Sequence, residues 1–278
     1  MMSKFLLKVN ANFMLAFVCI TGNFCYYFCW LVSLKLYFMH YIMMVSAAVK
    51  TASATNTALV LLDCQRSFIR GWWMAGVDPA EVQPLRLAFD HVAALLPKLS
   101  ADVRMLVTQC LFPTVSDFAL HAPVDDALAA RDAATVTRVI KPGNSVLQAH
   151  RATEWFDKVA ASGVDGVLPT VVFGGCTLTS CIRVSALDLY RRYGGNCSSQ
   201  PRLHICVDLN LCAARASNYV RRCHSCLSRY ITFYGRRTQP CTCKSGVDLI
   251  SPADKAVADM RAAGIQVYDS YDWSHCFV

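Results

Sequence analysis

The sequence predicts an α/β fold with a doubly wound, mostly parallel sheet and helices on both faces. Three observations lead to this prediction. From residue 57 onward, short apolar runs typical of buried strands alternate with longer segments of helical spacing. Such alternation is typical of parallel sheets, because every parallel connection needs a crossover segment. The chain has 278 residues, enough for one domain of about 200 residues with extensions.

The first predicted elements are three strands and a helix. Ala58–Leu62 is an apolar run that ends at Asp63, and Val82–Leu99 carries apolar residues at helical spacing. Met105–Thr108 and Thr135–Ile140 are short β-prone runs, which predict the second and third strands.

The second half continues the alternation of strands and helices. The remaining predicted strands are Val167–Phe173, Leu203–Val207 and Gln266–Tyr268. The remaining predicted helices are His150–Ser162, Cys181–Arg192 and Pro252–Ala263. We therefore expect one domain over residues 57–278.

Residues 1–50 form an apolar extension before this domain. Val9–Ser33 carries no charge, and residues 9–45 are long enough to cross a bilayer, which predicts a transmembrane signal anchor. The alternative is a start of translation at Met43 or Met44, with the upstream residues wrongly assigned to the protein. The predicted location is intracellular, cytoplasmic or mitochondrial, and membrane-anchored where the extension is real.

Charge and cysteine content exclude two other classes of protein. The net charge is +8, but the cationic residues gather in Arg215–Lys244 instead of following helices, so we expect no specific nucleic-acid partner. Several of the fifteen cysteines lie in apolar runs such as Val172–Cys176, which indicates reduced, buried thiols and not a secreted disulfide scaffold.

Three candidate catalytic residues follow predicted strands. Asp63 ends the first strand, Lys141 follows the third, and Cys181 follows the fourth after a turn that contains Gly174 and Gly175. Ligands of open α/β sheets bind outside the carboxyl ends of the strands, so all three side chains are expected at one crevice. A cysteine close to the start of a helix is suited to act as a thiolate nucleophile.

These residue types fit nucleophilic acyl transfer followed by hydrolysis. Asp63 can take the thiol proton and return it to a leaving amine, while Lys141 stabilises negative charge. Backbone N–H groups around Thr177 and Cys181 can form an oxyanion hole. Taken singly, each residue also has a structural explanation, because strand-end aspartates cap turns, lysines are usually solvated and apolar-flanked cysteines usually belong to the core.

The motifs resemble those of the isochorismatase-like cysteine hydrolases, most closely the isochorismatase domain-containing subgroup. The resemblance covers residues 57–272 and is carried by the following segments: Leu61–Phe68, Val107–Gln109, Pro113–Val115, Ile140–Lys141 with Ser145, Gly175–Ile182, Ala186–Leu189 and Val207–Asp208 with Cys212 and Arg215. It implies a catalytic trio of Asp63, Lys141 and Cys181. It also implies a cis peptide bond between Cys176 and Thr177.

The resemblance further implies a small amide or related acyl substrate, a thioester on Cys181, no cofactor and a homo-oligomer. By position, the substrate-binding residues would be Gln65, Phe68, Gln109 and Phe112. Metal-using relatives place Asp and His after the second strand, where this chain has Gln109 and Cys110, so no catalytic metal is expected. The alternative is a catalytically degenerate relative with a binding or scaffold role.

Relative to that family, residues 218–246 look like a basic, cysteine-rich insertion. The insertion contains Cys223, Cys226, Cys241 and Cys243 among several arginines. The spacing of the second cysteine pair is tighter than in common zinc sites, so a flexible loop is the prediction and zinc binding the alternative.

Overall fold

The computed structural model describes residues 56–71, 74, 76–163, 166–195, 200–222 and 249–278. The predicted extension over residues 1–50 lies outside these ranges, as does most of the predicted insertion. At the base of the insertion, Arg222 and Ile250 exchange two backbone hydrogen bonds, Arg222 N to Ile250 O at 2.9 Å and Ile250 N to Arg222 O at 3.1 Å.

The described part of the chain contains a six-stranded sheet in the order β3-β2-β1-β4-β5-β6. All five strand pairs are parallel, which confirms the predicted fold class. The strands are β1 (Thr57–Leu62), β2 (Arg104–Cys110), β3 (Val136–Lys141), β4 (Thr170–Cys176), β5 (His204–Ala213) and β6 (Gln266–Tyr268). The α-helices are α3 (Gln83–Leu95), α4 (Val115–Phe118), α5 (Ala122–Ala129), α6 (His150–Ala160), α7 (Arg183–Tyr193) and α9 (Pro252–Ala262).

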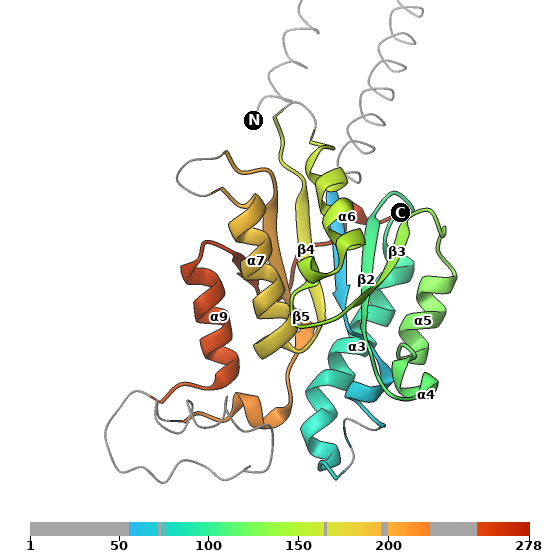
Figure 1. Ribbon diagram of the computed structural model, residues 1–278, viewed down its shortest axis with the longest axis vertical. Helices are drawn as coiled ribbons and strands as arrows, with labels where there is room; N and C mark the ends of the chain where they lie inside the picture. The colour runs from blue at the N-terminus through green and yellow to red at the C-terminus, as the bar shows by residue number, and fades with distance from the viewer. Residues whose placement is uncertain (1–55, 72–73, 75, 164–165, 196–199, 223–248) are drawn as a thin grey trace, which may run out of the picture. The chain divides into compact units, whose positions relative to one another are not determined.

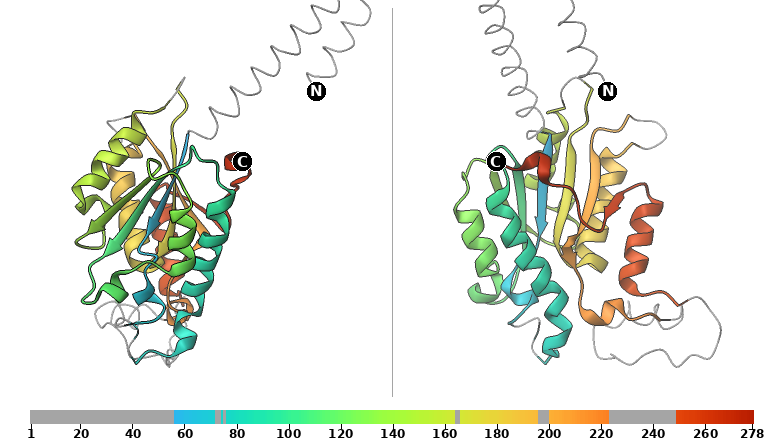
Figure 2. Two further views of the ribbon diagram at one scale, coloured as in Figure 1. Left: turned by 90° about the vertical axis from the view of Figure 1, so that its right-hand side faces the viewer. Right: turned by 180° about the vertical axis from the view of Figure 1, so that it is seen from behind.

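Helices cover both faces of the sheet (Figure 1). Side chains of α6, α7 and α9 pack on one face in a core cluster that includes Phe156, Leu189 and Met260. Side chains of α3 and α5 pack on the other face, where Phe89 and Val124 are fully buried. The edge-on view of Figure 2, left, shows the sheet between these two layers.

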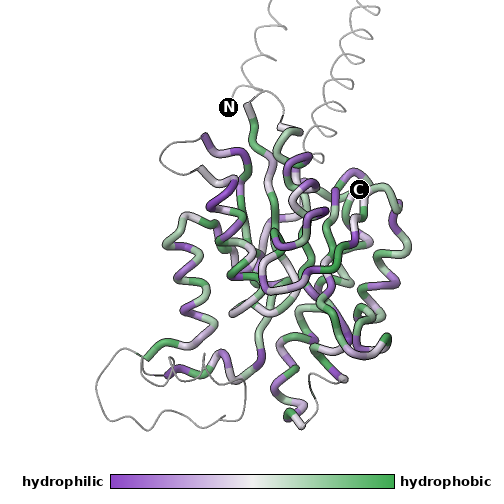
Figure 3. The backbone as a smooth tube through the Cα atoms, in the orientation of Figure 1, coloured by the Kyte–Doolittle hydropathy of each residue, from purple (hydrophilic) through white to green (hydrophobic). Residues whose placement is uncertain are grey.

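Burial on both faces explains why the central strands are continuous apolar runs. All six residues of β1 are buried, and its apolar side chains alternate between the two core clusters. In Figure 3 the central strands are accordingly hydrophobic along most of their length, whereas the helices mix both kinds of residue. Strands buried on both faces lack the polar-apolar alternation of half-exposed strands.

Several elements differ from the prediction. β4 begins and ends three residues later than the predicted strand Val167–Phe173, and α4 and α5 were not predicted. β5 continues to Ala213 instead of ending at Val207, and its pairing with β4 shifts register between Phe173 and Gly175. The helix predicted from Cys181 begins as η6 (Leu178–Ile182), one π-helical turn, and becomes α-helical only at Arg183. The differences in the bounds of elements arise where strand ends meet the following loops, and apolar periodicity carries little information there.

The strand order changes direction between β1 and β4. From β1 the chain proceeds through β2 to β3 on one side, and from β4 through β5 to β6 on the other. The carboxyl ends of β1 and β4 therefore lie at a topological switch point, where open α/β sheets hold their ligands. Asp63 and Thr177, the residues after these strands, are placed at this point by the topology alone.

The prediction of a transmembrane helix needs correction. None of the helices in the described ranges combines the length and the apolar character needed to cross a bilayer. Residues 9–45, on which the prediction was based, lie outside those ranges.

Candidate active site

Asp63 occupies a constrained position directly after β1. Its φ of 53° is the left-handed conformation that few non-glycine residues adopt. Two backbone hydrogen bonds hold this conformation. Gln65 N donates to Asp63 O at 2.6 Å, and Asp63 N donates to Thr108 O at 3.1 Å. The side chain is fully buried, and Thr108 Oγ1 donates to its Oδ1 at 2.7 Å. The carboxylate is therefore fixed at the carboxyl end of the sheet.

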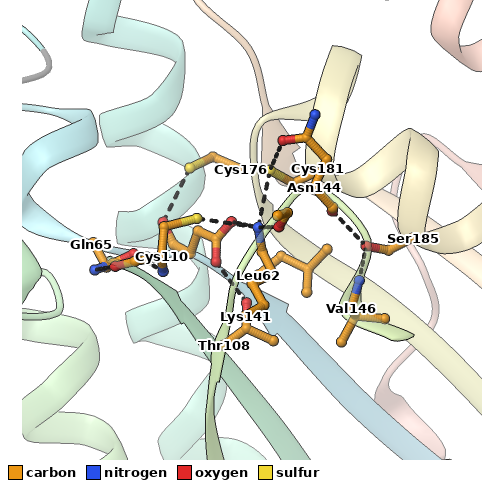
Figure 4. A network of polar contacts seen from close by, with 12 residues as sticks. Leu62, Gln65, Thr108, Cys110, Lys141, Asn144, Val146, Cys176, Cys181 and Ser185 are labelled. Atoms are coloured by element: carbon orange, nitrogen blue, oxygen red, sulfur yellow. Dashed lines mark hydrogen bonds and ion pairs between the residues drawn. The ribbon is translucent and has the colours of Figure 1, made fainter. Parts of the chain in front are cut away.

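Lys141, the last residue of β3, places its ammonium group at the centre of the site (Figure 4). Nζ lies 2.8 Å from Asp63 Oδ2, 2.8 Å from the carbonyl oxygen of Gly143 and 3.2 Å from Cys110 Sγ. Burial disfavours the charged form of Lys141, but the negative charge of Asp63 and the neighbouring thiols outweigh it, so its pKa is raised. The side chain is a buried cation at neutral pH.

Cys181 lies in η6, with its sulfur 3.4 Å from Lys141 Nζ and 3.8 Å from Asn144 Oδ1. A hydrogen bond with Cys110 has the largest effect on the pKa of Cys181 and lowers it. Burial and the charge of Asp63 act in the opposite direction, and Lys141 lowers the pKa further. Among the seven free cysteines of the described ranges, Cys181 is the one whose pKa is lowered.

Cys110 is a second thiol at this site, and no catalytic role was predicted for it from the sequence. It is the last residue of β2 and pairs in register with Lys141 of β3. Its sulfur, the sulfur of Cys181 and a carboxylate oxygen of Asp63 all lie within 4.8 Å of one another. The hydrogen bond with Cys181 and burial raise the pKa of Cys110. The sequence signal that could have pointed to Cys110 was its position at the end of the second strand.

The loop after β3 is tied to the first turn of α7. Ser185 Oγ accepts a hydrogen bond from Val146 N at 2.9 Å and donates to the carbonyl oxygen of Asn144 at 3.2 Å. Ser185 is fully buried. These bonds hold Gly143 and Asn144 against the Lys141 ammonium and the Cys181 sulfur, which makes Ser185 a positioning residue.

Gln65, a predicted substrate-binding residue, makes hydrogen bonds to backbone groups at the end of β2 and in α4. Its Nε2 donates to the carbonyl oxygens of Cys110 at 2.9 Å and Phe118 at 2.7 Å, and its Oε1 accepts from Cys110 N at 2.7 Å. The side chain is fully buried, so its amide is used in holding the end of β2. Gln65 thus positions Cys110.

The other predicted substrate-binding residues lie around the same strand end. Gln109 Nε2 also donates to Phe118 O, at 2.9 Å, and Gln109 lines a surface hollow of about 430 Å³. Phe68 and Phe112 stack edge to face with ring centroids 5.5 Å apart. Phe68 is buried in the α3-side core, and Phe112 is half-buried.

Cys176 and Thr177 connect β4 to the π-helical turn η6, and the peptide bond between them is cis. Cys176 Sγ donates to the carbonyl oxygen of Asp63 at 3.1 Å. Thr177 O accepts from Ser180 N at 3.0 Å and Ile182 N at 3.2 Å, bonds that close the π-helical turn around Cys181.

The donor set of Asp63, Cys110 and Cys181 raises the question of a metal ion. One carboxylate oxygen and two sulfurs within 4.8 Å are ligands that zinc accepts. The Lys141 ammonium, however, lies 2.8 to 3.4 Å from these atoms and so occupies the place of a cation. The residues present therefore fit an ammonium-centred site better than a metal site.

The three predicted catalytic side chains are nearly enclosed. Asp63 is 0%, Lys141 1% and Cys181 6% exposed. Only a small part of these residues is therefore accessible from solvent.

Similar folds occur among solved structures. No protein-family model and no curated protein matches the chain. A nicotinamidase from Bacillus subtilis is 12% identical with a TM-score of 0.47, over 77% of this chain and 99% of that one. An isochorismatase from Pseudomonas putida is 11% identical with a TM-score of 0.46, over 77% and 88%. An octameric hydrolase of unknown specificity from Escherichia coli is 11% identical with a TM-score of 0.43, over 77% and 75%. At these identities the similarity concerns the fold, and what the chain catalyses depends on its own side chains.

Proposed function

We propose that the chain is a cysteine-dependent hydrolase of the isochorismatase-like family that cleaves a small amide or a related acyl compound. The observation that carries this proposal is the buried Asp63–Lys141–Cys181 network, in which one ammonium contacts both a carboxylate and a thiol of lowered pKa. A cysteine that only fills space in a protein core does not require an ammonium and a carboxylate beside its sulfur.

In the first half-reaction, the Cys181 thiolate attacks the carbonyl carbon of the substrate. Asp63 accepts the thiol proton and delivers it to the departing amine, and a thioester on Cys181 remains. An Asp63 carboxylate oxygen and the Cys181 sulfur lie within 4.8 Å, a separation that a small movement or one bridging water spans. Lys141 stabilises negative charge on the thiolate and on the carboxylate in turn.

In the second half-reaction, water hydrolyses the thioester. Asp63 takes a proton from the water as it attacks the acyl carbon, and the Cys181 sulfur leaves as a thiolate beside Lys141. Backbone N–H groups near Thr177 and Cys181 are the proposed donors to the oxyanion, where the loss of one donor typically costs about 3 kcal/mol of transition-state stabilisation. The step needs no cofactor.

The pH dependence of iodoacetamide labelling at Cys181 tests this proposal. The thiolate fraction rises with pH, so the lowered pKa of Cys181 moves half-maximal labelling below the pH of an ordinary thiol. In Lys141→Ala the loss of a stabilising cation moves the midpoint to higher pH. In Asp63→Asn the loss of a repelling charge moves it to lower pH, while amide hydrolysis is abolished.

Mass spectrometry of the labelled peptides separates Cys181 from the other cysteines, and circular dichroism checks that each variant folds. Cys206→Ser is the matched control, because Cys206 is a buried cysteine in β5 whose burial raises its pKa to about 12. Slow labelling of Cys181 that neither site variant changes would rule out the hydrolase.

The second candidate is a non-catalytic relative with a binding or scaffold role. The observation in its favour is the enclosure of the three side chains, of which Cys181 is the most exposed at 6%. The labelling experiment separates the two candidates. A reactive Cys181 whose midpoint shifts in opposite directions in the two variants supports the hydrolase, and an unreactive one supports the scaffold.

Homo-oligomerisation stays a prediction from the sequence. Size-exclusion chromatography with light scattering measures it directly on the full chain.

A further inference from the structure

The mechanism proposed above leaves Cys110 without a role, although its sulfur lies beside the nucleophile. The Sγ atoms of Cys110 and Cys181 are within 4.8 Å of each other, and Lys141 Nζ contacts them at 3.2 Å and 3.4 Å. Both thiols are free. Figure 4 shows Lys141 reaching between the two cysteines.

We propose that Cys110 and Cys181 form a reversible disulfide when the site meets a hydroperoxide, which makes Cys110 the resolving thiol and the site redox-sensitive. The inference uses the chemistry of two thiols alone, so it goes beyond the proposed hydrolase and does not depend on turnover.

The distances allow the bond to form by side-chain motion. The two sulfurs must approach from 4.8 Å or less to about 2.05 Å. A change of rotamer at one cysteine moves its sulfur by about 3 Å. A movement of that size is comparable to the approach that the bond requires.

The surroundings favour these two thiols over other cysteines nearby. Cys181 has a lowered pKa and is slightly exposed, the two properties that make a thiol prone to oxidation. Cys64 and Cys176 are fully buried with raised pKa values, and Cys176 donates to the Asp63 carbonyl. Cys110 is less buried than either of them.

Lys141 keeps a charged partner when the disulfide forms, so oxidation does not leave a buried cation unpaired. When the disulfide forms, the ammonium loses two sulfur acceptors but keeps Asp63 Oδ2 and the Gly143 carbonyl, each at 2.8 Å. A buried cation that retains a carboxylate partner avoids the large penalty of an unpaired charge.

The oxidation proceeds in two steps. The Cys181 thiolate attacks a peroxide oxygen, the O–O bond breaks, and Cys181 becomes a sulfenic acid while the leaving hydroxide takes up a proton as water. The Cys110 sulfur then attacks the Cys181 sulfur, the S–O bond breaks, and a second water leaves with the Cys110 proton. Two thiols are oxidised to one disulfide, and one hydrogen peroxide is reduced to two waters.

Peptide mapping after peroxide treatment tests the inference. The full chain is treated with hydrogen peroxide, free thiols are blocked, and the protein is digested with trypsin without reduction. Cleavage at Arg and Lys gives peptide 105–131, whose single cysteine is Cys110, and peptide 159–183, which contains Cys176 and Cys181. The expected product joins these peptides through Cys181, and fragment ions between Cys176 and Cys181 assign the linkage.

Variants give the second readout. Dithiothreitol restores labelling of Cys181 almost fully in the oxidised wild type. In Cys110→Ser and Cys110→Ala the linked peptides are absent, and recovery falls several-fold because the sulfenic acid proceeds to sulfinic acid. Cys206→Ser, with its change far from the site in β5, behaves as the wild type.

The inference is overturned by a linkage through Cys176, by no linkage at all, or by full recovery of Cys181 in both Cys110 variants. None of these readouts uses a substrate. If the chain forms the disulfide but hydrolyses no amide, the proposed function is therefore rejected and this inference stands.

Discussion

Lys141 contacts more acceptors than it has N–H bonds. Its three N–H bonds face four acceptors, namely Asp63 Oδ2, Gly143 O and the sulfurs of Cys110 and Cys181. The ammonium can therefore transfer a hydrogen bond from one sulfur to the other without leaving the site. With more acceptors than N–H bonds, the ammonium can hydrogen-bond whichever group carries the negative charge, the carboxylate or the thiolate.

Replacing Lys141 by Met should destabilise the protein by about 3 to 5 kcal/mol, because the Asp63 carboxylate is left buried and unpaired. Urea unfolding measures the free energy. The double variant Asp63→Asn with Lys141→Met is expected to recover part of this loss, since it removes the orphaned charge. Equal losses in the single and the double variant would show that the pair contributes through packing and not through charge.

Thr108 is a residue that only the structure connects to the site, through its hydrogen bond to Asp63 Oδ1. Thr108→Val keeps the shape but removes the donor, and should cost about 1 to 3 kcal/mol of stability. Thr108→Ser keeps the hydroxyl and is the matched control for the hydrogen bond. If denaturant midpoints of the two variants coincide, the bond has no energetic role.

At the scale of elements, the site depends on how closely β4 approaches β1. Gly175 pairs with Leu62 and has a φ of +105°. A Cβ at this position would lie 2.0 Å from the Leu62 carbonyl oxygen, far inside van der Waals contact. Glycine is required here, because any side chain would push apart the strands that carry Asp63 and Cys176.

Gly175→Ala is therefore expected to destabilise the fold by several kcal/mol, or to prevent folding. Gly76→Ala is the control: its φ is also positive, +75°, but a Cβ there meets nothing within 4 Å, so only the backbone cost of about 1 kcal/mol applies. Thermal unfolding of both variants separates steric clash from backbone strain. Similar melting temperatures would refute the close approach of the strands.

At the scale of the whole described domain, the C-terminal segment joins distant parts of the fold. Trp273 Nε1 donates to the buried Asp208 Oδ2 of β5 at 2.9 Å. Beyond it, Cys276 O accepts from Ser100 N at 2.7 Å, and Phe277 forms a bridge with Leu99. The segment after β6 thus fastens the loop between α3 and β2, far from its own strand in the sheet order.

Trp273→Phe should lower the free energy of unfolding by about 1 to 3 kcal/mol, because Asp208 loses a donor while staying buried. Burial already raises the pKa of Asp208 and the Trp273 hydrogen bond opposes this, so the variant raises that pKa further. Phe277→Ala, at a side chain that is 44% exposed, is expected to change stability less. An equal effect of both substitutions would argue against a specific role of the Trp273 bond.

Most of the architecture could be predicted from the chain itself. Apolar runs and helical spacing indicated every strand of the sheet and every helix that packs on it except α4 and α5. The two short helices carry too few apolar positions for periodicity to stand out. The extent of β5 was also missed, because its residues after Asp208 mix polar and apolar types.

The spacing of apolar runs along the chain was enough to predict which residues stand at the ends of parallel strands, and hence that Asp63, Lys141 and Cys181 would gather at one edge of the sheet. The tertiary structure decided which side chains touch. Cys110 lies beside Lys141, and Gln65 binds the backbone of Cys110, because strand order and register place β2 between β1 and β3. Periodicity along a chain reports burial, whereas contacts between strands depend on pairings that local spacing does not encode.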